Sequence, residues 1–172
     1  MRRPILAGVT AVAVLASTAA IAQEAGSRQT REFVQAAGHS DAFEKLEAAT
    51  ALTQSHDPQV QAFARTMLRD HNRLSNALQQ ATAHAGLQPP PMGVGADQAP
   101  IFAGLQSLKE PEFDRTYWKQ QALAHHSALI TTQQYAANGD SAAVRQAAAS
   151  ALPIITAHLA VAERMMAKSG GS

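Results

Sequence analysis

Four titratable side chains stand on the apolar stripes of four helical stretches, and together they could do metal chemistry. They are Glu44, His71, His125 and His158. Each lies three, four or seven residues from apolar neighbours, and these spacings place residues on one face of a helix. Neutral imidazole and carboxylate suit zinc, copper or iron, and this set can fill a four-coordinate shell or leave a position for water. The pattern therefore suggests a transition-metal site.

A second interpretation needs no metal. Burying titratable groups costs several kcal/mol unless they pair or bind an ion. Hydrogen bonds among the four, with help from Gln121, Thr132 or water, could compensate. Counted from the hairpin turns at about 1.5 Å per residue, the axial levels differ by ~5 Å in the first helix pair and ~7 Å in the second. One site of four residues and two separate pairs therefore both remain open.

The sequence argues against two other kinds of site. Ferritin-like di-iron centres use Glu-x-x-His motifs, because residues i and i+3 share a helix face. Here the positions three residues before the inward histidines are apolar: Leu68, Ala122 and Ile155. No serine triad, phosphate-binding loop or paired-carboxylate motif occurs either. We therefore predict no ferroxidase centre and no catalytic residue, and the sequence leans away from an enzyme.

The first 22 residues are typical of a secretory signal peptide. Arg2 and Arg3 supply the positive start, the stretch 5–20 is apolar and uncharged, and Ala20-Ile21-Ala22 matches a small-x-small cleavage site. A membrane anchor is less favoured, because the apolar stretch is short for a span of ~20 residues. The chain has no cysteine, which excludes disulfides, thiolate ligands and a lipidated cysteine. We expect cleavage after Ala22 and a mature protein in the periplasm.

The charge pattern excludes partners that need a basic surface. Removing the two arginines of the signal changes the formal net charge from +1 to −1, and no basic run or stripe remains. Nucleic acids and anionic membranes are bound mainly through such positive surfaces. We therefore expect no nucleic-acid partner. We also expect no transmembrane segment in the mature chain. The sequence leaves an envelope partner or a homo-oligomer open.

Helix-forming segments account for nearly all of the mature chain, which we expect to be one domain, 23–172. Long helices are predicted at about 29–54, 58–86, 111–138 and 141–168. Asp57 and Pro58 suit the N-cap and first position of the second helix, and Asn138-Gly139 should end the third. The stretch 88–100 holds three consecutive prolines and two glycines, so it cannot be helical. A short helical turn is expected at about 101–108.

The lengths of the connections predict the topology. Very few residues join the first helix to the second and the third to the fourth, so each pair should form an antiparallel hairpin. The connection between the hairpins is long enough to run the length of the molecule. We therefore predict an all-α antiparallel four-helix bundle, ferritin-like with one long crossover between two helical hairpins. A plain up-down bundle is the alternative.

The chain resembles a known bacterial family over about residues 33–166. The first half carries Phe43-Glu44, Asp57-Pro58-x-Val60-x-Ala62-Phe63-Ala64 and Met67-x-x-Asp70-His71. The second half carries Glu112-Phe113-Asp114-x-x-Tyr117, His125, Leu152-Pro153 and His158-Leu159. In order and spacing, these stretches are similar to the exported bacterial family known as domain of unknown function 4142 (DUF4142).

The resemblance implies a ferritin-like four-helix fold and export to the periplasm or outer envelope. Members are often labelled as outer membrane proteins, a label that does not require a membrane span. The resemblance implies no established activity. Its matching positions include the four candidate ligands, but Ala124 stands where an acidic residue often precedes the histidine of the third long helix. This departure weakens the case for a side chain at position 124 that supports the neighbouring His125.

Two functional hypotheses follow. In the first, the chain is an exported periplasmic or envelope four-helix bundle that binds or handles a metal, with Glu44, His71, His125 and His158 as ligands. In the second, it is a non-enzymatic envelope interaction or stress-protective module, and its polar core only fixes the register of the helices. Metal content and the convergence of the four side-chain tips distinguish the two.

Overall fold

The computed structural model describes residues 26–169, which form five helices and no strand. The helices are α1 (Arg28–Gln54), α2 (Pro58–His84), α3 (Ala99–Gln106), α4 (Glu112–Asn138) and α5 (Ala142–Ser169). The prediction of an all-α chain is confirmed, and the long helices begin and end within two residues of the expected ranges. The expected signal peptide, 1–22, lies outside the described residues. No helix in the described range is long and apolar enough to cross a membrane.

Local signals in the sequence set the helix ends. The Asp57 carboxylate accepts a hydrogen bond from the N–H of Gln59 and caps α2, and Pro58 follows at the start of the helix. Gly139 ends α4, and a Cβ at this position would lie 2.5 Å from the ring of Tyr135. The turn between α4 and α5 therefore requires glycine.

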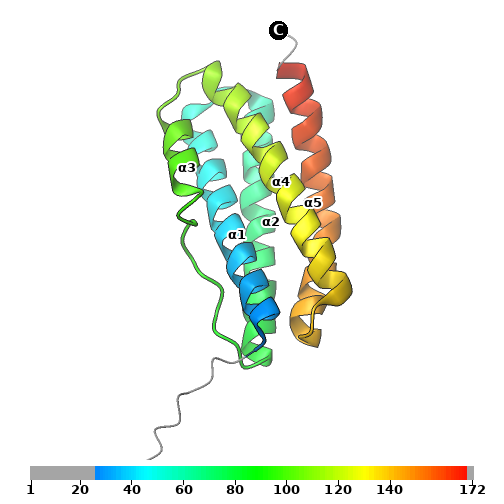
Figure 1. Ribbon diagram of the computed structural model, residues 1–172. Helices are drawn as coiled ribbons and strands as arrows, with labels where there is room; N and C mark the ends of the chain where they lie inside the picture. The colour runs from blue at the N-terminus through cyan, green and yellow to red at the C-terminus, as the bar shows by residue number, and fades with distance from the viewer. Residues whose placement is uncertain (1–25, 170–172) are drawn as a thin grey trace, which may run out of the picture.

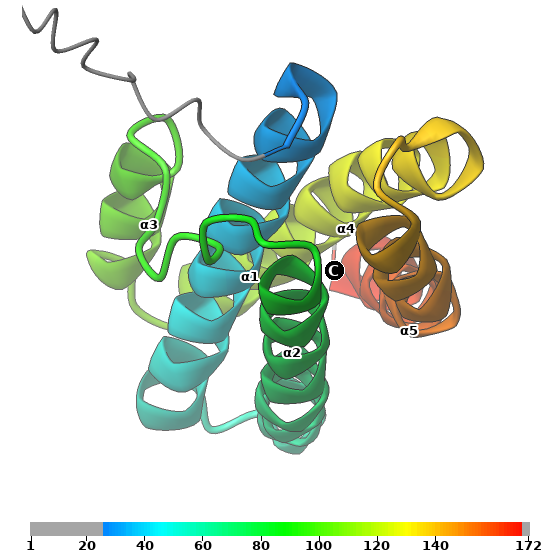
Figure 2. The ribbon, with the colours of Figure 1, turned by 90° about the horizontal axis from the view of Figure 1, so that it is seen from below.

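The four long helices lie side by side, and α3 packs against α1 and α4 (Figure 1). α1 packs on α2 and α4, and α5 packs on α4 and α2. Tight turns join α1 to α2 at the top of Figure 1 and α4 to α5 at the bottom. Because α2 and α4 both run downward in this view, the connection between them returns along the outside of α1 (Figures 1 and 2).

The connection between α2 and α4 is fixed to the first half of α1. A Cβ added to Gly38 would lie 2.6 Å from Cδ and 2.9 Å from the carbonyl oxygen of Pro91. Two residues further along the connection, the carbonyl oxygen of Gly93 lies 2.7 Å from Nδ1 of His39, which can donate to it. The close approach of the proline-rich segment to the helix therefore depends on the glycine at position 38.

Two apolar clusters fill the interior at different heights. The first includes Phe63, Met67, Tyr117 and Trp118. The second includes Phe33, Val34, Tyr135 and Val144. On every long helix, the candidate ligand predicted from the sequence falls between the residues of the first cluster and those of the second. A polar layer therefore separates the two halves of the apolar core.

Candidate metal centre

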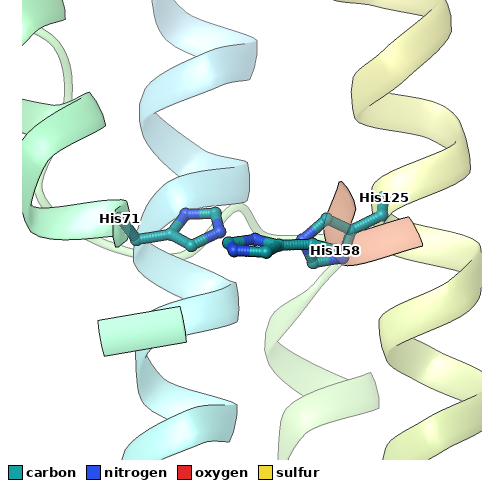
Figure 3. Close-up of side chains that lie close together, drawn as sticks. All are labelled: His71, His125 and His158. Carbon is teal, nitrogen blue, oxygen red and sulfur yellow. The ribbon is translucent and has the colours of Figure 1, made fainter. Parts of the chain in front are cut away.

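His71, His125 and His158 point toward one another from α2, α4 and α5 (Figure 3). One ring nitrogen from each lies within 4.8 Å of the other two, and all three side chains are buried. The ring centroids are between 5.3 and 5.8 Å apart. Ligand nitrogens around a tetrahedral zinc ion lie roughly 3.4 Å apart, at bonds of about 2.0–2.1 Å. Small rotations of the rings would therefore bring the set to bonding distance.

His71 is flanked by two carboxylates of α1. Its Nδ1 lies 2.9 Å from Oδ1 of Asp41 and can donate a hydrogen bond to it. Its Nε2 lies 3.0 Å from Oε2 of Glu44. That second contact is short enough for an ion pair, but its direction does not suit a hydrogen bond, and Nε2 has no hydrogen-bond partner among the described residues. With the proton on Nδ1, Nε2 presents a free lone pair.

His125 also has one bonded and one free nitrogen. Its Nδ1 donates to the main-chain carbonyl of Gln121, one turn earlier in α4, at 2.9 Å. A carbonyl can only accept, so in a neutral ring this bond places the single proton on Nδ1 and leaves the lone pair on Nε2. That nitrogen is buried without a hydrogen-bond partner in the described part of the chain, 3.8 Å from Oε2 of Glu44.

His158 follows the same pattern with its nitrogens exchanged. Its Nε2 lies 3.1 Å from Oδ2 of Asp70 on α2, and its Nδ1 is buried with no hydrogen-bond partner within residues 26–169. Asp70 is itself held by Arg69 at 3.1 Å. In metal sites, the histidine nitrogen that does not bind the ion commonly donates to a carboxylate or carbonyl, which orients the ring. All three histidines have such a partner here.

Glu44 borders the three histidines from α1. Its side chain is almost completely buried, and Oε1 accepts a hydrogen bond from Ser40 at 3.2 Å. Its Oε2 lies beside Nε2 of both His71 and His125. The structure thus brings three of the four predicted residues into one cluster and places the fourth next to two of its members.

The surroundings shift the proton affinities of His158 and His71 in opposite directions. Burial and the neighbouring His125 and His71 lower the pKa of His158 to about 4, although Asp70 acts the other way. Burial also lowers the pKa of His71, but Glu44 and Asp41 outweigh it and the net shift is upward. His158 is therefore neutral at pH 7, which is the state in which a histidine binds metal.

The sequence alone does not point to two carboxylates that support the cluster, Asp41 and Asp70. Asp41 lies three residues before Glu44, so helical spacing could have placed it on the same face. Burial raises its pKa, but its hydrogen bonds and the nearby Lys45 outweigh burial, and the net shift is downward. Asp70 adjoins His71 in sequence but bonds to a histidine on another helix, and no spacing rule indicates that contact.

A second buried carboxyl group lies one turn from Glu44. Glu47 is fully buried, and its Oε2 accepts a hydrogen bond from Nε2 of Gln121 at 2.8 Å. Burial raises the pKa of Glu47 to about 8; the bond from Gln121 opposes this shift and the charge of Glu44 adds to it. Because a protonated carboxyl is a poor metal ligand, Glu47 is not part of the candidate centre.

The remaining histidines lie outside the cluster: His39, His56, His84 and His126. His126 is exposed although it follows His125 directly, as expected for a residue about 100° further around the helix. His56 is also exposed, and its Nδ1 pairs with Glu110 at 3.0 Å. Only the inward histidines of α2, α4 and α5 therefore meet within the described chain.

Comparison with known proteins identifies the family. Residues 15–165 match the family described as "Domain of unknown function (DUF4142)". The helical fold is similar to the crystal structure of a DUF305 fragment from Deinococcus radiodurans, with a TM-score of 0.71 and 17% sequence identity over 85% of this chain and 99% of that chain. No curated protein matches the chain significantly. As the resemblance of its motifs predicts, the chain belongs to the DUF4142 family.

Proposed function

We propose that this chain binds one transition-metal ion through His71, His125 and His158, with Glu44 as the fourth ligand. The ligand atoms are Nε2 of His71, Nε2 of His125, Nδ1 of His158 and Oε2 of Glu44. One observation carries the proposal. Each of these three buried nitrogens lacks a hydrogen-bond partner in the described chain, while the other nitrogen of the same ring is bonded to an oxygen.

The energetic cost of buried groups without a partner favours a bound ion over a polar core whose members only hydrogen-bond to one another. Leaving a buried acceptor without a partner costs about 1–3 kcal/mol. In the neutral form that binds metal, each histidine can place its single ring proton on the outward nitrogen, toward Asp41, Asp70 or the carbonyl of Gln121. The inward nitrogens are then all acceptors and cannot bond to one another. A divalent ion satisfies the three lone pairs at once.

The donor set selects the class of ion. Imidazole nitrogens with one carboxylate suit zinc, copper and iron, whereas calcium and magnesium prefer sites made of oxygen alone. The chain contains no cysteine, so sites that depend on thiolate ligands are excluded. Zinc, copper and iron are therefore the ions to test.

The proposed scaffold is an antiparallel four-helix bundle with a ferritin-like crossover between two hairpins. The tight turn within each hairpin and the long return from α2 to α4 support this assignment (Figure 1). The chemistry would differ from that of a ferritin-type di-iron centre, because no carboxylate stands three residues before any of the clustered histidines. We therefore infer metal binding or handling rather than iron oxidation.

We further propose that the protein is exported and acts in the periplasm or cell envelope as a single domain, 23–172. The support lies in the sequence of the first 22 residues, with its two arginines, its apolar stretch and a cleavage site after Ala22. In that compartment the centre would buffer or deliver its ion. A nucleophile with an acid–base partner, which a hydrolytic reaction would require, has no recognisable motif in the chain.

Elemental analysis of the mature protein tests the metal site. The protein is isolated from the periplasm without chelator or affinity tag, beside His71→Ala and His126→Ala. We expect about one ion per chain in the wild type and in His126→Ala, and almost none in His71→Ala. His126 is a matched control, because it is an exposed histidine next to the clustered His125.

Equal metal content in His71→Ala and the wild type, or none in either, would contradict the proposal. The protein would then be a non-enzymatic envelope interaction or stress-protective module with a purely structural polar core. That alternative has its own signature. Replacing the whole polar set by apolar residues should be tolerated, with unchanged or higher stability.

A further inference from the structure

A cavity of about 960 Å³ lies beside the histidine cluster. All four long helices and the proline-rich connection contribute to its wall. Glu44 and His71 are part of the lining, so the cavity reaches the cluster itself. Alanines form much of the remaining wall, among them Ala37, Ala128 and Ala151. Their small side chains leave the interior open at this level.

A second hollow approaches the cluster from another side. This groove of about 610 Å³ is lined by residues that include Asp70, Trp118 and His158. Among the candidate ligands it contacts His158 alone, whose Nε2 is bonded to Asp70. The larger cavity instead contacts His71 and Glu44, whose Nε2 and Oε2 lie 3.0 Å apart. The larger cavity therefore offers the more direct route to an ion.

We infer that the larger cavity admits a small uncharged organic molecule whose single nitrogen donor completes the coordination shell of the ion. This inference rests on the metal site proposed above. Three histidines leave one position of a tetrahedral shell for Glu44 or an external ligand, and such shells can expand to five ligands. Pockets of roughly 300–1,000 Å³ are the usual size for small-molecule sites.

The wall of the cavity favours an uncharged and mainly apolar molecule. Its charged groups near the cluster are already paired: Lys45 lies 2.7 Å from Asp41, and Arg73 lies 3.8 Å from Asp70. An ionic ligand would have to compete with these pairs. The alanine wall would contact an apolar body, and hydroxyl groups such as that of Thr132 could orient it. A nitrogen donor suits the same ions as the histidines do.

Cobalt(II)-loaded protein provides the test, because the visible bands of cobalt report on its ligands. Imidazole is the probe, added to the wild type, Ala128→Leu and Ala137→Leu. Ala128 lines the cavity, and Ala137 is an exposed alanine of the same helix that lies outside it. We expect imidazole to shift the bands of the wild type and Ala137→Leu. Ala128→Leu should weaken imidazole binding by about tenfold or more.

Cobalt content after gel filtration checks that imidazole has not removed the ion. Ala151→Leu narrows the same cavity from α5 and takes the place of Ala128→Leu if circular dichroism shows that variant to be unfolded. Wild-type bands that imidazole does not shift would overturn the inference and leave the metal site standing. Equal binding by the wild type and the narrowed variant would overturn it as well. Failure to take up cobalt would overturn both the metal site and this inference.

Discussion

Asp70 and His158 join the two hairpins: Oδ2 of Asp70 on α2 lies 3.1 Å from Nε2 of His158 on α5. The next residue along α2 is His71, which belongs to the histidine cluster. One helix therefore supplies, at adjacent positions, a candidate ligand and the partner of another candidate ligand. A carboxylate in that second role orients the imidazole and raises its basicity. Asp70 would thus influence the affinity for metal without touching the ion.

Asp70→Ala should weaken metal binding by about 10–100-fold, because the ring of His158 would lose the acceptor that orients it. A competitive zinc titration against a chromophoric chelator measures the change. Glu163→Ala is the control, since Glu163 is an exposed carboxylate on α5. We expect that control to bind zinc as the wild type does. Wild-type affinity in Asp70→Ala would show that the carboxylate plays no part in the site.

Copper(II) should quench the fluorescence of Trp118, the single tryptophan of the chain. The rings of Trp118 and Phe63 are 5.1 Å apart, and those of Phe63 and His158 are 5.8 Å apart. A paramagnetic ion at the cluster is therefore close to the indole. Emission titrations should show saturable quenching in the wild type and in His126→Ala but not in His158→Ala. Equal quenching in both variants would place the copper elsewhere.

The metal-free protein should lose stability through His158 as the pH falls from 6.5 to 4. Folding lowers the pKa of this residue from 6.5 to about 4. In that window the unfolded chain binds a proton that the folded chain does not, so protons favour unfolding. The loss is at most about 3.5 kcal/mol at about 1.4 kcal/mol per pKa unit. The free energy of unfolding of His158→Gln should therefore fall less over this pH range. Urea unfolding in EDTA measures the difference.

His71 gives the contrast for that experiment. Its pKa is raised by folding, so its stabilisation is fully present below pH 6.5 and is lost as the pH rises through the folded pKa. His71→Gln should therefore change how stability falls at alkaline pH. The loss of stability on acidification should still depend on His158. An equal loss of stability on acidification in His158→Gln and the wild type would contradict the assignment of that loss to His158.

Glu47→Gln should stabilise the protein above pH 8. Burial is the main reason that the pKa of Glu47 rises from 4.5 to about 8. Between these values the folded chain holds a proton that the unfolded chain releases, so stability falls as the pH rises. Glutamine keeps the shape without the charge, and the gain at pH 9 should be about 2–4 kcal/mol. Urea unfolding at pH 6 and pH 9 measures it.

Glu32→Gln is the control for Glu47→Gln, because the Glu32 side chain is 61% exposed and pairs with the exposed Arg28. Surface pairs of this kind contribute little. The control should therefore show nearly the wild-type stability at both pH values. A Glu47→Gln variant no more stable than the wild type at pH 9 would mean that the Glu47 carboxyl is not strained by its burial.

Gly38→Ala should loosen the proline-rich connection from α1. The added methyl group would meet Cδ and the carbonyl oxygen of Pro91, and overpacking of this kind costs about 1–3 kcal/mol. Gly104→Ala is the matched control in α3, where nothing lies within 4 Å of the new Cβ. It should be neutral or stabilising by about 0.5–1 kcal/mol. Thermal unfolding and hydrogen exchange of residues 88–98 separate the two outcomes.

The helices were predictable because their ends carry strong local signals. Asp57-Pro58 starts α2 and Gly139 ends α4, both where the sequence places them. The end of α2 was less certain: the helix stops at His84 rather than at 86, since Gly86 adopts a positive φ of 66°. A glycine close to the end of a helix marks the region of the stop but not the residue.

The site was only partly predictable. Helical spacing placed Glu44 and the three histidines inward, but counting residues from the turns gave levels that differ by ~5 and ~7 Å. In the structure the histidine nitrogens come within 4.8 Å of one another. Residue counting treats the helices as parallel rods, whereas they are inclined to one another (Figure 2). The partners Asp41 and Asp70 depend on contacts between helices, which one-dimensional spacing does not contain.

The histidines of the cluster come from both hairpins: His71 from the first, and His125 and His158 from the second. Each hairpin is closed by its own tight turn, and residues of both hairpins line the cavity beside the cluster. A bound ion would therefore act as a removable cross-link between two hairpins that the chain joins only through the long connection from α2 to α4. The rate at which a protease cuts this connection, compared with and without metal, would report how strongly the ion holds the two hairpins together.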